Sequence, residues 1–146
     1  MSGAISRAEA VWEGDLLSGR GKVSPGSKVF PEQAITWAAR AERKPGTTSP
    51  EELLAAAHAG CFAMALSNIL AKAGTPPERL EVSAEAAFEK VEDGYRVTKI
   101  VLNVAGRVKG ITAEKFVEAA KQAGGGCPIS KALKNNVEIV VNARLI

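Results

Sequence analysis

Residues 49–73 form a long helical pattern that is apolar on almost every side, and this segment constrains the fold more than any other. Ser49 suits the N-cap and Pro50 suits the first helical position, while Gly74 and the two prolines beyond it end the pattern. A helix that is apolar nearly all round is buried rather than resting on a surface. We therefore predict a long central helix that packs in the core or against a second copy of the chain.

The same segment approaches the length needed to cross a membrane. His58, Ser67 and Asn68 interrupt it, however, and alanine dominates over leucine and isoleucine. The N-terminus has no apolar segment behind a basic start, so it does not resemble a secretory signal. We expect a cytoplasmic protein without a membrane partner, in which a permanent structural disulfide would be unusual.

Short strands are predicted before the helix and mixed elements after it, which indicates an α+β fold. Alternation over residues 7–13 and the turn residues that follow predict an N-terminal β-meander that ends near residues 35–37, followed by a basic loop over residues 40–46. Later elements are a hairpin of two strands with a bulge between Val97 and Ile100, a helix from Thr112 to Gly124, a short helix from Cys127-Pro128 to about 134, and a final strand over 137–145.

Composition supports one ordinary globular domain over residues 1–146, with 46% hydrophobic and 24% charged residues. The net charge of +3 is scattered along the chain, and the seven aromatic residues, four Phe, two Trp and one Tyr, are too few and dispersed for base stacking. We therefore expect no nucleic-acid partner.

The two cysteines occupy unusual places. Cys127 lies between a glycine run and Pro128, at the N-cap of the short helix, where free backbone N–H groups favour a thiolate. Cys61 lies in the apolar helix, where burial should raise its pKa unless a cation is supplied from elsewhere. Composition alone favours small buried filler for both residues, whereas their placement favours redox chemistry.

His58 precedes Cys61 by three positions and so shares its helix face. This pair permits a Cys–His hydrolase, and with Cys127 a metal site, but no C-x-x-C or H-x-x-x-H pairing supports zinc. A single histidine in a buried helix is more often a hydrogen-bonded core residue, so we assign it no chemical role.

Two motifs resemble one family. The run TSPEELLAAAHAGCFAMAL from Thr48 to Leu66 is similar to the central helix of the OsmC/Ohr proteins, the osmotically inducible protein C and organic hydroperoxide resistance proteins. The run GCPISKAL from Gly126 to Leu133 resembles the same family, and the opening Trp12-Glu13-Gly14-Asp15 and the order of elements resemble its OsmC branch. The resemblance covers nearly the whole chain.

This resemblance implies a thiol peroxidase that reduces organic hydroperoxides to alcohols. Cys61 matches the peroxidatic cysteine, which becomes a sulfenic acid, and Cys127 matches the resolving cysteine, which condenses with it to a disulfide. Arg40 matches the arginine that holds Cys61 as thiolate, and Glu51 matches the glutamate that orients this arginine. The segment before Pro50 is about one residue longer than the OsmC pattern, which leaves Arg43 as a competitor. No metal, flavin or haem is implied, and the reductant would be an external dithiol such as a dihydrolipoyl protein.

Helix geometry adds a separate argument for a dimer. Glu51 and Cys61 would lie about 15 Å apart along one helix, too far for a single site. An antiparallel second helix would bring Glu51 of one subunit beside Cys61 of the other, as in the family's intertwined obligate homodimer. A non-enzymatic redox sensor or small-molecule-binding module with the same fold and thiols is the alternative function.

Overall fold

A computed structural model describes residues 3–146. The chain divides into two compact units, residues 1–50 and residues 51–146. The single domain expected over residues 1–146 stays a prediction.

The first unit contains the predicted meander. β1 (Ala8–Glu13), β2 (Arg20–Pro25) and β3 (Gln33–Ile35) form an antiparallel sheet in the order β1-β2-β3. The basic loop predicted from residue 40 begins instead inside a short helix, α1 (Trp37–Glu42). Six residues are too few for a periodic pattern to reveal a helix, and the helix depends on its cap.

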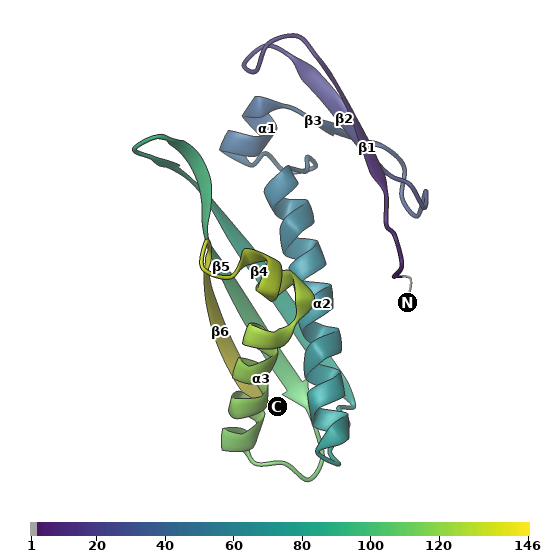
Figure 1. Cartoon of the computed structure of the whole chain (residues 1–146), viewed down its shortest axis with the longest axis vertical. Helices are drawn as coiled ribbons and strands as arrows, with labels where there is room; N and C mark the ends of the chain where they lie inside the picture. The colour runs from purple at the N-terminus through teal and green to yellow at the C-terminus, as the bar shows by residue number, and fades with distance from the viewer. Residues whose placement is uncertain (1–2) are drawn as a thin grey trace. The chain divides into compact units, whose positions relative to one another are not determined.

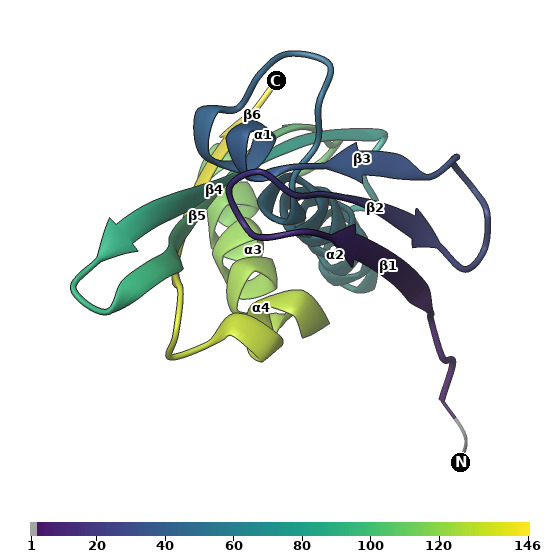
Figure 2. The ribbon, with the colours of Figure 1, turned by 90° about the horizontal axis from the view of Figure 1, so that it is seen from above.

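The second unit places two helices against one three-stranded sheet. α2 (Pro50–Lys72) begins where Pro50 predicted, and β4 (Arg79–Val91) and β5 (Gly94–Arg107) form the predicted hairpin. The hairpin tip extends beyond the helices of this unit in both views (Figures 1 and 2). Ala87 pairs with Lys99 and Phe88 with Val97, so the extra residue lies in β5 at the predicted bulge.

The remaining elements cross over the sheet and return to it. α3 (Ala113–Gly126) and α4 (Pro128–Leu133) lead to β6 (Glu138–Leu145), which pairs in parallel with β5, giving the order β4-β5-β6. Thr112 caps α3 as predicted, and α3 ends two residues later than predicted. A parallel pair needs a long connection, and the two helices supply it.

The core of this unit lies between α2, α3 and the sheet, and α2 and α3 lie side by side over it (Figure 1). Phe62, Leu66 and Leu70 of α2 are almost fully buried there. The prediction of a buried helix therefore holds for one face of α2. On another face Met64 is 76% exposed.

Within residues 3–146, α2 is also the one helix with the length and composition of a membrane span, and its packing into this core identifies it as a core helix.

Candidate active site

Cys61 lies halfway along α2 beside a mostly apolar pocket of about 440 Å³. The pocket is formed by α2, the end of α3 and the start of α4. Its lining residues are Cys61, Met64, Ala65, Asn68, Ile69, Gln122, Gly126 and Pro128. Cys61 is partly buried, so its thiol is partly shielded from solvent and can still be reached from this pocket. Such a pocket suits a small apolar substrate.

Cys127 connects α3 to α4, as the C-cap of the first and the N-cap of the second, and is completely buried. Its backbone N–H donates to the Ala123 carbonyl at 3.0 Å, which ends α3. Its sulfur accepts from the backbone N–H of Ser130 at 3.4 Å, as an N-cap side chain does at the third helical position. The predicted N-cap role of Cys127 is therefore confirmed.

The structure brings the two free thiols together in the core of the second unit, although 66 positions separate them in the sequence. Burial raises the pKa of Cys61, the backbone N–H of Ile129 in α4 lowers it, and the neighbouring Cys127 thiol raises it further. An interaction of this kind requires close contact between Cys61 and the first turn of α4. The raised pKa agrees with the prediction that Cys61 requires a cation to become a thiolate.

His58 is a hydrogen-bonded core residue, as its position in a buried helix indicated. Its side chain is fully buried, and its Nε2 lies 2.7 Å from the Ser130 hydroxyl oxygen. That same oxygen lies 3.0 Å from the Cys127 sulfur. Burial lowers the pKa of His58, so its imidazole is neutral at pH 7. The histidine is thus connected to Cys127 through Ser130.

Glu51 and Arg40 belong to different units of the chain. Glu51 lies in the first turn of α2 and is 6% exposed, ten positions before Cys61 on the same helix. Arg40 lies in the last turn of α1, beside an apolar pocket of about 270 Å³ within the first unit that Trp12 and Trp37 also line. Their roles toward Cys61 stay predictions.

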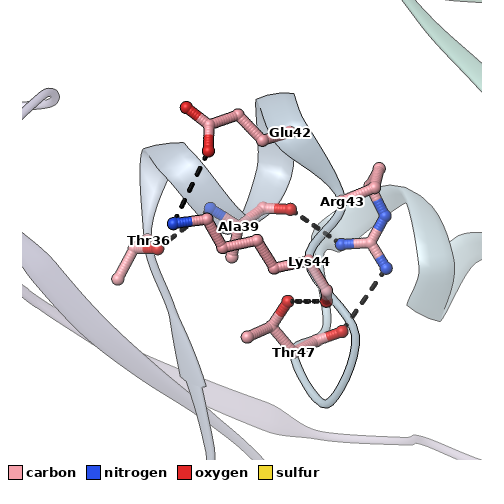
Figure 3. Close-up of polar contacts among 6 residues, drawn as sticks. All are labelled: Thr36, Ala39, Glu42, Arg43, Lys44 and Thr47. Carbon is pink, nitrogen blue, oxygen red and sulfur yellow. Dashed lines mark hydrogen bonds and ion pairs between the residues drawn. The ribbon is translucent and has the colours of Figure 1, made fainter.

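Arg43, the competing arginine, makes hydrogen bonds that hold the loop following α1 (Figure 3). It ends α1 in the left-handed conformation, with φ 53°. Its Nη1 donates to the Ala39 carbonyl at 2.8 Å, and its Nη2 donates to the Thr47 carbonyl at 3.4 Å. Two planar donors engaged with backbone carbonyls give Arg43 a structural role in this loop.

Within residues 3–146, no group of three or more His, Cys, Asp or Glu side chains is placed to bind a metal ion. The chemistry that these residues offer is that of two adjacent thiols.

The order and spacing of these features match a known family. Residues 43–142, more than half of the chain, match the family model described as OsmC-like protein. The chain belongs to the OsmC-like protein family. The match includes Glu51, Cys61 and Cys127 and begins after Arg40.

Relatives within the OsmC-like family point to its OsmC branch. The chain is 41% identical to Peroxiredoxin OsmC of Escherichia coli (strain K12) over 133 residues, which covers 91% of this chain and 92% of that protein. It is 31% identical to Organic hydroperoxide resistance protein OhrA of Bacillus subtilis (strain 168) over 124 residues, covering 83% and 85%. The higher identity is with the OsmC protein, as the resemblance predicted.

The fold is shared as well. The crystal structure of the organic hydroperoxide resistance protein OhrB of Bacillus subtilis superposes with a TM-score of 0.75 at 25% identity, covering 94% of this chain and 98% of that one. An organic hydroperoxide resistance protein OsmC from Legionella pneumophila superposes with a TM-score of 0.70 at 21% identity, covering 97% and 99%. The predicted α+β OsmC/Ohr fold is therefore confirmed.

Sequence reasoning assigned no role to Ser130, although the residue stands in the quoted motif. The position of Ser130 could have indicated its contact with Cys127. It stands three residues after an N-cap cysteine, where the backbone N–H of the residue faces the cap side chain. Its contact with His58 spans 72 positions and had no local signal.

Proposed function

We propose that this protein reduces organic hydroperoxides to alcohols through Cys61 and Cys127. Thiol-dependent peroxidase activity is the function of its family, whose members include Peroxiredoxin OsmC and organic hydroperoxide resistance proteins. The observation that carries the proposal is the contact between the two thiols at an apolar pocket. A single oxidised thiol would need an external partner, whereas this pair can close its own disulfide.

The proposed reaction proceeds in three steps. The Cys61 thiolate attacks the terminal peroxide oxygen, the O–O bond breaks, and the alkoxide leaves as the alcohol after taking up a proton. Cys61 is then a sulfenic acid, and attack by Cys127 on its sulfur forms the S–S bond and releases water. An external dithiol reduces the disulfide and is itself oxidised to a disulfide.

Cys61 requires activation because burial raises its pKa. Arg40 is the proposed source of the cation, with Glu51 orienting its guanidinium. The hydrogen bonds of Arg43 to the Ala39 carbonyl of α1 and the Thr47 carbonyl of the loop support Arg40 over Arg43 for this role. A bound arginine beside a thiol lowers its pKa and thereby raises the fraction of reactive thiolate.

Both units support an obligate homodimer with sites at its interface. On α2, the side chain of Met64, which lines the Cys61 pocket, is 76% exposed in the single chain. In the first unit, Val11, Leu17 and Val29 are 63%, 74% and 77% exposed. Exposed apolar side chains on α2, on β1 and in the turns between the strands of the first sheet mark surfaces that a second copy would bury. The proposal also includes a cytoplasmic location and a dihydrolipoyl protein as reductant.

Paired cysteine variants test the function. We expect Cys61→Ser to abolish consumption of cumene hydroperoxide, and Cys127→Ser to allow at most a first turnover before overoxidation. Mass spectrometry after one equivalent of peroxide should show the loss of two hydrogens in the wild type. Full activity of Cys61→Ser would refute the proposal, and disulfide formation without steady-state turnover would favour the redox-sensor alternative.

A further inference from the structure

His58, Ser130 and Cys127 form a buried chain of polar groups that the three reaction steps above do not use. The Ser130 hydroxyl oxygen lies 2.7 Å from His58 Nε2 and 3.0 Å from the Cys127 sulfur. The exposed fractions are 0% for His58 and Cys127 and 2% for Ser130. Hydrogen bonds this well shielded from water are electrostatically stronger than those exposed to it, and leaving any member of the chain unpaired is costly.

The direction of donation follows from the other ring nitrogen of His58. Nδ1 is buried and has no hydrogen-bond partner among the described residues. A neutral imidazole carries one N–H, and burying that N–H without an acceptor is costly. The proton therefore resides on Nε2, which donates to the Ser130 oxygen. The hydroxyl proton of Ser130 is then directed at the Cys127 sulfur.

We propose that His58 orients the Ser130 hydroxyl so that it donates to Cys127 and stabilises the thiolate form of this resolving cysteine. This inference rests on the proposed roles of Cys61 and Cys127. Ser130 gives the sulfur two donors, its hydroxyl and its backbone N–H at 3.4 Å. Hydrogen bonds to a charged acceptor are stronger than those to a neutral one, so both donors favour the thiolate. Ser130 touches the reacting sulfur, and His58 is a positioning residue.

The two donors serve both halves of the cycle. In the oxidative half, the Cys127 thiolate attacks the sulfur of the Cys61 sulfenic acid, the S–O bond breaks, and hydroxide leaves. The proton that the Cys127 thiol gives up is balanced by the one that this hydroxide takes up, so a thiol and a sulfenic acid give a disulfide and water. In the reductive half, the donors stabilise Cys127 as the leaving thiolate, and a stabilised leaving thiolate departs faster.

Burial decides which sulfur the reductant attacks. Cys127 is completely buried, whereas Cys61 is partly buried and lines the open pocket. The dithiol therefore attacks Cys61, and Cys127 leaves with the electron pair of the S–S bond. A leaving group in a dry site depends on fixed donors because water does not solvate its charge.

Rapid mixing with cumene hydroperoxide separates the step that uses Ser130 from the step that does not. Oxidation of Cys61 depends on peroxide concentration, and closure of the disulfide does not. In Ser130→Ala we expect an unchanged first phase and a second phase slowed roughly tenfold to a hundredfold, which is the value of a hydrogen bond to a charged group. Dimedone trapping followed by mass spectrometry should show the longer-lived sulfenic acid.

A second arm starts from the disulfide formed with diamide and follows its reduction by dithiothreitol. Ser130→Ala should slow this reduction by a similar factor. The arm does not involve peroxide, so it tests the proposal even if the peroxidase function fails. A wild-type protein without a peroxide-dependent first phase would refute that function alone.

Variants of His58 test the direction of donation. His58→Leu should reproduce the slow second phase of Ser130→Ala, whereas His58→Gln keeps an N–H donor and should restore the rate to within a few-fold of wild type. Ser67→Ala, the same substitution as Ser130→Ala but placed on α2, is the control and should change neither phase. An unchanged second phase in Ser130→Ala, or a His58→Gln variant as slow as His58→Leu, would overturn the proposal.

Discussion

Two neighbouring glycines near the end of α3 differ sharply in their surroundings. A Cβ at Gly124 would overlap Cγ2 of Val141 in β6, and it would lie 3.9 Å from Cε1 of Phe62 in α2. A Cβ at Gly125 would have no heavy atom within 4 Å beyond its chain neighbours and the nearby backbone of α3 itself. The pair Gly124→Ala and Gly125→Ala therefore makes the same chemical change in a packed and in an open position.

The expected free energies follow from this contrast. Either alanine improves the helix by up to about 1 kcal/mol because glycine is a poor helix former. Only the alanine at Gly124 forces atoms apart in a packed core, which costs about 1–3 kcal/mol. Val141 relieves little of this cost because a β-branched side chain has few χ1 rotamers. Gly125→Ala should thus be more stable than Gly124→Ala by about 1–3 kcal/mol, since the helix term cancels.

Urea unfolding monitored by circular dichroism measures this difference directly. A functional measurement accompanies it, because Gly124 is three residues before Cys127 and a displaced α3 would move this thiol away from Cys61. We expect slower disulfide closure in Gly124→Ala and an unchanged rate in Gly125→Ala. Equal unfolding free energies for the two variants would refute the close packing of α3 against β6.

Three further predictions concern the arginines, the dimer and the pH dependence of stability. Arg40→Ala should reduce peroxide turnover by at least about tenfold, as expected for loss of a charged hydrogen bond, whereas Arg43→Ala should mainly lower the melting temperature; the reverse pattern would exchange their roles. Met64→Lys should shift the protein toward monomers in analytical ultracentrifugation and lower its activity, because a lysine would be buried at the proposed interface. Because the pKa of His58 is lower in the folded protein, the unfolded chain binds a proton more readily. The contribution of the neutral, buried imidazole to the free energy of unfolding is therefore present above pH 6.5 and is lost as the pH falls through the lower folded pKa. Below about pH 6.5 the wild type should therefore lose unfolding free energy more steeply than His58→Gln in urea titrations, and parallel curves would contradict a buried neutral imidazole.

Local chemistry explains which parts of the fold were predictable. Helix starts are fixed by residues within a single turn, and these can be recognised in the sequence. Examples are Pro50 at the first turn of α2, Thr112 at the cap of α3 and Pro128 after the capping Cys127. The bulge beside Val97 was visible as a phase change in alternation. α1 was missed because its six residues are held by a cap and an arginine rather than by an apolar stripe.

The sequence by itself determined every element except α1, the family and the identity of the two thiols, because caps, turns and motifs act over short distances along the chain. Only the tertiary structure decided that β6 pairs in parallel with β5, and it placed Cys127 next to Cys61, as the family resemblance implied. It also decided that His58 meets Ser130, 72 positions away. Such contacts depend on how α2, α3 and the sheet pack together, and packing is a property of many distant residues at once.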